Sequence, residues 1–210
     1  ALMPYLDAYW YAAFRSRGIE RTSFTLTGDP PTTPLAARPD WRPKSGKPGS
    51  DLELLRSQAL DGFGSSIAIA NCLFGGMALH SEDLAAVMCK AVNDWVADTW
   101  LDKEPRLRAS ILVPQQSPEL AVEEIERRAH DKRFVQITLL AMGNELLGRR
   151  SLWPIYEAAV RHNLPIGIHA GGLYHHPTLN GWGSYFLEDY VANAFAFENQ
   201  VVSLVCEGAF

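Results

Sequence analysis

One histidine in this sequence is well placed to bind a metal ion or to act as a general base. His169 ends the short apolar stretch 164–168, and two glycines follow at 171–172. The stretch is too brief for a helix, and its pattern is typical of a strand buried on both faces of a parallel sheet. In α/β barrels the reactive side chains lie at the carboxyl ends of such strands. A core histidine bonded to a neighbouring carbonyl group is the alternative.

Several other side chains are candidates for contact with a small-molecule substrate: Asn71, Gln115, Met142, His175, Trp182 and Tyr185. The first three come just after predicted strands, so we expect them at the same edge of the sheet as His169. The last three lie in or next to the predicted loop 171–183, where the two aromatic rings could form the wall of a pocket for a planar acid. Ordinary loop or packing roles explain the loop residues equally well.

The elements that must position these residues alternate along the chain. Apolar stretches predict strands at residues 65–70, 106–113, 134–140 and 164–170, and helical spacing predicts helices at 5–17, 51–60, 81–104, 117–130, 151–162 and 185–207. Repeated strand–helix units indicate a parallel sheet, either in a barrel or in an open doubly wound fold. Four strands cannot close a barrel, and an eight-stranded barrel needs about 250 residues. We therefore expect an α/β fold that is part of a (β/α)8 barrel and belongs to a longer protein.

We expect a single domain over residues 1–210. Residues 27–50 are the exception to its regular pattern, because they contain six of the 13 prolines. Prolines at this density prevent both a helix and a central strand. The segment is therefore predicted to be a long loop within the domain.

Composition excludes several classes of protein. The net charge is −5 and the 19 basic residues are scattered, which argues against a nucleic-acid or membrane surface. The three cysteines have no close spacing, so reduced thiols and a cytoplasmic location are the better interpretation. No apolar stretch reaches the roughly 18 residues of a transmembrane helix.

Segments 131–136, 153–159 and 164–172, with shorter ones near both ends, resemble the amidohydrolase-related family that contains aminocarboxymuconate-semialdehyde decarboxylase. The resemblance implies a distorted barrel of which this chain holds strands two to five, and a divalent metal, usually zinc. It also implies that His169, on the fifth strand, is a metal ligand. The other ligands of the family, on strands one and eight, would fall outside this chain, as would its catalytic acid.

The resemblance thus implies a metal-dependent hydrolase or non-oxidative decarboxylase that acts on a small carboxylated or cyclic substrate. One imidazole is too few for a catalytic metal site, so we expect these 210 residues to be inactive by themselves. We also expect self-association, since homo-oligomers are common among soluble enzymes. A non-catalytic α/β binding module that uses the loop at 171–185 is the main alternative, and an open flavodoxin-like sheet ranks last.

Overall fold

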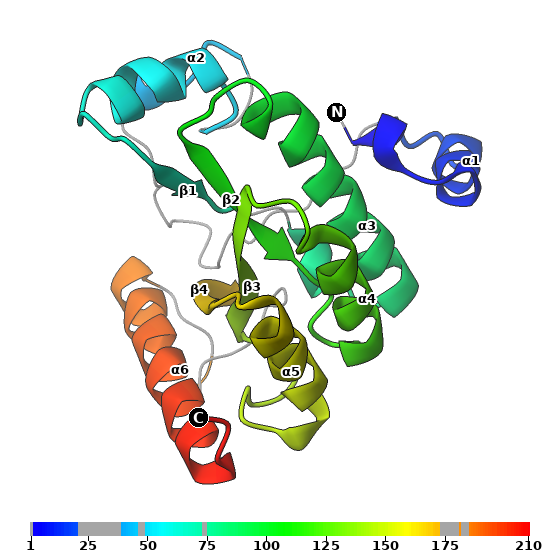
Figure 1. Cartoon of the computed structure of the whole chain (residues 1–210), viewed down its shortest axis with the longest axis vertical. Helices are drawn as coiled ribbons and strands as arrows, with labels where there is room; N and C mark the ends of the chain where they lie inside the picture. Colours follow the sequence, from blue (N-terminus) through cyan, green and yellow to red (C-terminus); the bar gives the residue numbers. More distant parts are fainter. Residues whose placement is uncertain (1, 21–38, 46–48, 73–74, 173–180, 182–184) are drawn as a thin grey trace.

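The structure is a computed structural model, and it describes residues 2–20, 39–45, 49–72, 75–172, 181 and 185–210 (Figure 1). Most of the predicted proline-rich loop lies outside these residues. The candidates His175 and Trp182 lie outside them as well.

Four parallel strands form the centre of the described part of the fold. They are β1 (Ala68–Ala70), β2 (Leu107–Leu112), β3 (Phe134–Met142) and β4 (Ile166–Gly172), and they pair in chain order (Figure 1). Each successive pair is parallel. The predicted strand–helix alternation is confirmed, and the curled sheet is half of a (β/α)8 barrel.

Six α-helices lie in the described residues: α1 (Ala8–Ser16), α2 (Leu52–Leu55), α3 (Glu82–Val96), α4 (Pro118–Arg128), α5 (Trp153–His162) and α6 (Phe186–Glu207). Two of them continue in wider π-helical turns, α2 through Arg56–Asp61 and α3 through Ala97–Leu101. Short 3-10 helices occur at Met3–Tyr5, Pro39–Trp41, Gly75–Ala78 and Arg150–Leu152.

Local sequence explains where two of these helices begin or end. The Ser81 hydroxyl accepts a hydrogen bond from the backbone N–H of Leu84, which satisfies an otherwise unpaired donor at the start of α3. Asn163 ends α5 in the left-handed conformation, with φ of 53°. Asparagine tolerates this conformation better than most residues, so the chain can turn directly into β4.

The two faces of the sheet differ in chemistry. Helices α3 and α4 pack against β2, and α4 packs against α5, so that this outer face carries buried side chains such as Ile111, Ile137 and Leu139. The opposite face carries Ser110 and Gln136, which are register partners on β2 and β3. In a barrel, that opposite face is the one that lines the interior.

The prediction that the strand before His169 is buried on both faces is wrong. β4 is the last strand in the order, and Ile166, Ile168 and His169 on it are only half-buried. At the other end of the sheet, Ile69 on β1 is 48% exposed. Apolar residues on both sides of these strands suit a closed barrel, in which both faces of the sheet are covered. In the part of the chain that the structure describes, helices cover only the outer face.

Candidate metal and substrate site

The register of β4 changes directly after His169. Leu140 on β3 pairs with His169, whereas Met142 pairs with Gly172, so β4 contains one more residue than β3 between the two pairs. A register shift of this kind marks a β-bulge or another irregularity of the sheet. Bulges bend the strand, redirect the neighbouring side chains and are common beside active sites. The prediction that His169 ends its strand is wrong, because β4 continues to Gly172 and His169 lies three residues before its carboxyl end. The predicted metal ligand thus lies on a parallel strand, next to an irregularity of the sheet.

The imidazole of His169 has one nitrogen engaged by the protein. Its Nδ1 lies 2.5 Å from the carbonyl oxygen of Ala170, which can only accept a hydrogen bond. Nδ1 is therefore the protonated nitrogen, and Nε2 carries the free lone pair. Metal-binding histidines characteristically donate their second N–H to a carbonyl in this way. A histidine without a metal makes the same bond, so the bond agrees with both predictions for His169.

The described residues fit one ligand of a metal site and do not complete it. No group of three or more His, Cys, Asp or Glu side chains in the described ranges is arranged to hold an ion. Catalytic zinc sites use about three protein ligands and an open position. His169 can thus contribute to a site, but it cannot hold a metal tightly by itself.

A polar network on the inner face joins three strands. The Ser110 hydroxyl donates to Asn71 Oδ1 at 2.5 Å, and Gln136 Nε2 donates to Ser110 Oγ at 2.7 Å. A side chain at Gly167 on β4 would lie 2.9 Å from Gln136 Nε2, so the missing Cβ makes room for the amide. The candidate Asn71 belongs to this network, and its role as a substrate contact stays a prediction.

Sequence reasoning missed the other two members of the network. The only signal in the sequence was that each is a polar residue between two apolar neighbours on a strand. Arg108 and Thr138 interrupt the same two strands, and Ser110 is as buried as the residues on either side of it, so this signal does not single them out. A polar residue at such a position faces the opposite side of the sheet from its apolar neighbours.

The side chain of Gln115 bonds to the backbone of β3. Its Oε1 accepts a hydrogen bond of 2.7 Å from the N–H of Leu140, and its Nε2 lies 3.4 Å from the carbonyl oxygen of the same residue. Since β2 has ended at Leu112, this amide continues the hydrogen-bond ladder beyond the strand. Gln115 is only 7% exposed, and its predicted substrate contact remains untested.

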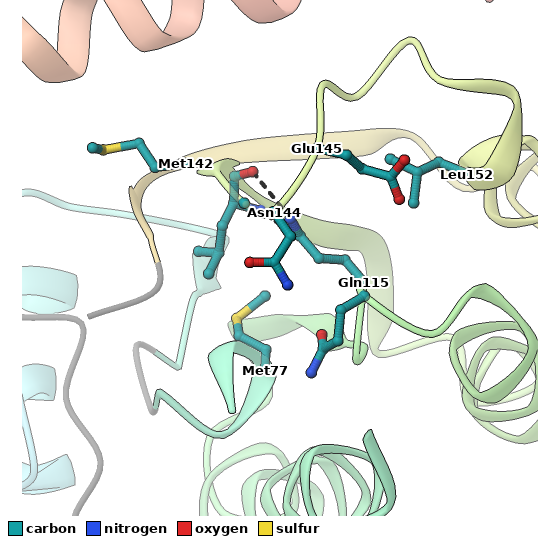
Figure 2. Close-up of a pocket in the computed structure, with 9 residues that line it drawn as sticks. Met77, Gln115, Met142, Asn144, Glu145 and Leu152 are labelled. Atoms are coloured by element: carbon teal, nitrogen blue, oxygen red, sulfur yellow. Dashed lines mark hydrogen bonds between the residues drawn. The ribbon is translucent and has the colours of Figure 1, made fainter. Parts of the chain in front are cut away.

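A small cavity lies at the carboxyl-terminal edge of β2 and β3 (Figure 2). Its volume is about 60 Å³, and its walls are formed by Met77, Gln115, Gln116, Leu140, Met142, Gly143, Asn144, Glu145 and Leu152. The Asn144 side chain extends toward Met77, while the Met142 side chain points away from both. The candidates Gln115 and Met142 thus both contribute to one cavity.

Helix α6 holds the loop that forms one wall of this cavity. Gln200 Oε1 accepts from the N–H of Leu147, and Gln200 Nε2 donates to the carbonyl oxygen of Ala141 at 2.6 Å. The Ser203 hydroxyl accepts from the N–H of Gly148. These bonds connect residues more than 50 positions apart, and nothing in the sequence analysis indicated them.

The candidate Tyr185 lies apart from the cavity walls. It precedes α6, its side chain is 71% exposed, and its backbone N–H donates to Glu188 Oε2. This bond satisfies a donor at the start of the helix. A contact between Tyr185 and a substrate stays a prediction.

Among the described residues, the carboxyl group with the most strongly shifted pKa lies at the other end of the sheet. Glu104 precedes β2, and hydrogen bonds from the side chain and backbone of Arg106, assisted by Arg56, lower its pKa to about 2. Ion-pair networks of this kind also perturb pKa values outside catalytic sites. Because active sites of parallel α/β folds lie at the carboxyl ends of the strands, we assign this cluster to stability.

A family model described as amidohydrolase matches residues 7–199. The chain belongs to the amidohydrolase family. No curated protein matches it.

Solved structures similar to this member of the amidohydrolase family include several decarboxylases. One is a 5-carboxyvanillate decarboxylase from Novosphingobium aromaticivorans, with bound manganese and 3-methoxy-4-hydroxy-5-nitrobenzoic acid. It is 29% identical in sequence, and the match covers 59% of this chain and 36% of that chain with a TM-score of 0.51. The apo IDCase of Metarhizium anisopliae is 21% identical, with 91% of this chain and 57% of that chain covered and a TM-score of 0.67.

A third structure, 2,6-dihydroxybenzoate decarboxylase from Rhizobium, is 20% identical over 75% of this chain and 52% of that chain, with a TM-score of 0.63. The last two similarities establish the fold. The chain spans between about a third and three fifths of the length of these three proteins.

Proposed function

We propose that this chain forms part of a metal-dependent decarboxylase for small aromatic carboxylates. The observation that carries the proposal is the position of His169 on β4, three residues before the carboxyl end of the strand, with Nδ1 bonded to a backbone carbonyl and with no partner for Nε2 among the described residues. The 29% identical neighbour, a decarboxylase that contains manganese and a nitrobenzoic acid, supports this function over hydrolysis.

In this proposal His169 Nε2 is one ligand of a divalent metal. When bound, such an ion acts as a Lewis acid that polarises a substrate oxygen. The Asn71, Ser110 and Gln136 network presents polar groups on the same inner face of the sheet, where they can orient a substrate. The hydrogen bond from Nδ1 to Ala170 fixes the plane of the imidazole ring.

The identity of the metal is part of the proposal. The family resemblance implies zinc. Three of the similar solved structures, all decarboxylases, were instead determined with bound manganese. A cytoplasmic location and self-association stay predictions. No helix among the described residues is both long and apolar enough to cross a membrane.

The test uses the longest open reading frame that contains this sequence, purified with manganese or zinc. Carbon dioxide release from a panel of hydroxylated benzoates is measured for the wild type, for His169→Ala and for the exposed control His130→Ala. We expect metal-dependent turnover in the wild type and the control, and at least a 100-fold loss of turnover in His169→Ala, together with weaker metal binding.

Two results would refute the proposal. Unchanged turnover and metal content in His169→Ala would exclude His169 as a ligand. A metal-free protein that binds aromatic acids without releasing carbon dioxide would support the alternative of a non-catalytic binding module.

A further inference from the structure

A buried glutamine of α6 bonds to the carboxyl end of β3. Gln200 is only 5% exposed. Its Oε1 accepts from the N–H of Leu147 at 2.7 Å, and its Nε2 donates to the carbonyl oxygen of Ala141 at 2.6 Å. Since each end of the amide holds a backbone group, Gln200 constrains the path of the chain at two positions.

Ala141 lies where the pairing of β3 and β4 changes. It stands between Leu140, which pairs with His169, and Met142, which pairs with Gly172. It is therefore opposite the stretch of β4 that contains one residue more than β3.

The carbonyl oxygen that Gln200 holds faces β4. The N–H of Ile137 donates to the carbonyl oxygen of Pro165, directly before β4, so the backbone groups of Ile137 are turned to that strand. Successive carbonyl groups of a strand point to opposite sides, and Ala141 follows Ile137 by an even number of residues. Gln200 Nε2 therefore lies at the junction of β3 and β4, where the register shifts.

The same stretch of β4 carries the group that orients the imidazole of His169. Ala170 follows His169 inside this stretch, and its carbonyl oxygen lies 2.5 Å from Nδ1. The direction of this carbonyl depends on the path that β4 takes past Ala141, because an irregularity of the sheet redirects the residues next to it. Loss of the shift would therefore turn the carbonyl away and release Nδ1.

We propose that Gln200 is a positioning residue for His169. Its amide holds the Ala141 carbonyl at the junction and so keeps the register shift in place. The shift directs the Ala170 carbonyl to Nδ1, which leaves Nε2 for the metal. The importance of this arrangement for metal binding rests on the proposed function, whereas its effect on the imidazole does not. The alternative is that Gln200 only attaches α6 to the sheet.

The first test measures the two neutral tautomers of His169 by nitrogen-15 NMR of the 210-residue chain. It is done at about pH 8, well above the usual histidine pKa of about 6.5. Gln200→Met has a side chain of similar length and removes both bonds. We expect the ratio of the Nδ1-protonated to the Nε2-protonated form to fall about five-fold, the effect of losing one neutral hydrogen bond.

A second variant separates the two bonds of Gln200. Gln200→Glu keeps an acceptor for the N–H of Leu147, but its carboxylate cannot donate to the carbonyl oxygen of Ala141. The ratio should therefore fall in this variant as well.

Ser203→Ala is the matched control. Ser203 lies on the same helix, and its hydroxyl accepts from the N–H of Gly148 in the loop after β3. We expect this variant to lose stability and to keep the wild-type ratio of tautomers. A purely structural role for Gln200 would also lower stability, so it is the ratio that distinguishes positioning from attachment.

The second test measures manganese affinity in the protein encoded by the longest open reading frame that contains this sequence. Loss of a group that orients a metal-binding histidine typically weakens metal binding by at least about ten-fold. We expect that loss in Gln200→Met and no loss in Ser203→Ala.

An unchanged tautomer ratio in either Gln200 variant would overturn the inference, as would an equal fall in Ser203→Ala. If one Gln200 variant does not fold, the other supplies the same comparison. A wild-type protein that binds no metal, or unchanged affinity despite a lower ratio, would count against the proposed function alone. The tautomers would still decide the role of Gln200.

Discussion

Leu140 on β3 lies opposite His169 on β4, and on its other side its backbone N–H donates to the side-chain amide of Gln115. The strand that supports the proposed metal ligand is therefore itself held by a side chain from the end of β2. Directly after this pair the register shifts by one residue. The position of His169 thus depends on hydrogen bonds made well away from its own strand.

Replacing Gln115 with methionine should destabilise the protein. The change leaves the buried N–H of Leu140 without an acceptor, which costs about 1–3 kcal/mol. Urea unfolding should show this loss, and amide exchange at Leu140 should accelerate. The control Gln58→Met removes a hydrogen bond close to the surface and should cost less than about 1 kcal/mol. Equal losses in the two variants would contradict the role assigned to Gln115.

Two glycines beside the cavity should differ in their tolerance of alanine. A Cβ at Gly148 would lie 2.2 Å from the backbone oxygen of Ser203, whereas a Cβ at Gly143 would lie 2.4 Å from Nε2 of Gln115, at the end of a side chain. Overpacking typically costs about 1–3 kcal/mol, and a side chain moves more easily than a helix backbone. We expect Gly148→Ala to lose more stability than Gly143→Ala in urea unfolding. The reverse order would show that the contact between Gly148 and Ser203 of α6 is looser than the structure indicates.

The neutral imidazole of His169 should exist as the Nδ1-protonated tautomer. The Ala170 carbonyl oxygen accepts a hydrogen bond from Nδ1 and cannot donate one, so the proton is held there and Nε2 is left as the metal-binding atom. Nitrogen-15 NMR of labelled histidine separates the two tautomers. A ring protonated at Nε2 would rule out this arrangement.

The contribution of Glu104 to stability should decline in acid. Hydrogen bonds from Arg106 lower its pKa in the folded protein to about 2, compared with about 4.3 for an unfolded glutamate. A lowered pKa stabilises the fold above the unfolded value, and this contribution is lost as the pH falls toward 2. Glu104→Gln should therefore unfold at a lower urea concentration than the wild type at pH 7, with a gap that narrows between about pH 4.3 and pH 2.

The exposed residue Glu123 provides the control for this comparison. Glu123→Gln should change the urea midpoint little at any pH, since exposed charges contribute weakly to stability. A gap between the wild type and Glu104→Gln that stays constant with pH would show that packing of Glu104, rather than its charge, stabilises the fold.

Local patterns in the sequence were enough to predict the class of fold and the position of the main candidate. The alternation of apolar strands and amphipathic helices, the Ser81 cap and the Asn163 turn each depend on residues a few positions apart, so they can be read from the chain directly. The same patterns placed His169 on a strand and Gln115 just after one.

Tertiary structure decided how these pieces meet. The register shift after His169 depends on how two strands pair, and the Asn71–Ser110–Gln136 network joins side chains up to 65 positions apart. Gln200 reaches the carbonyl oxygen of Ala141 across 59 positions. Such contacts form only when distant segments pack together. The spacing of apolar residues defines each helix or strand, but it does not specify which backbone groups at the end of a strand will need a side-chain partner.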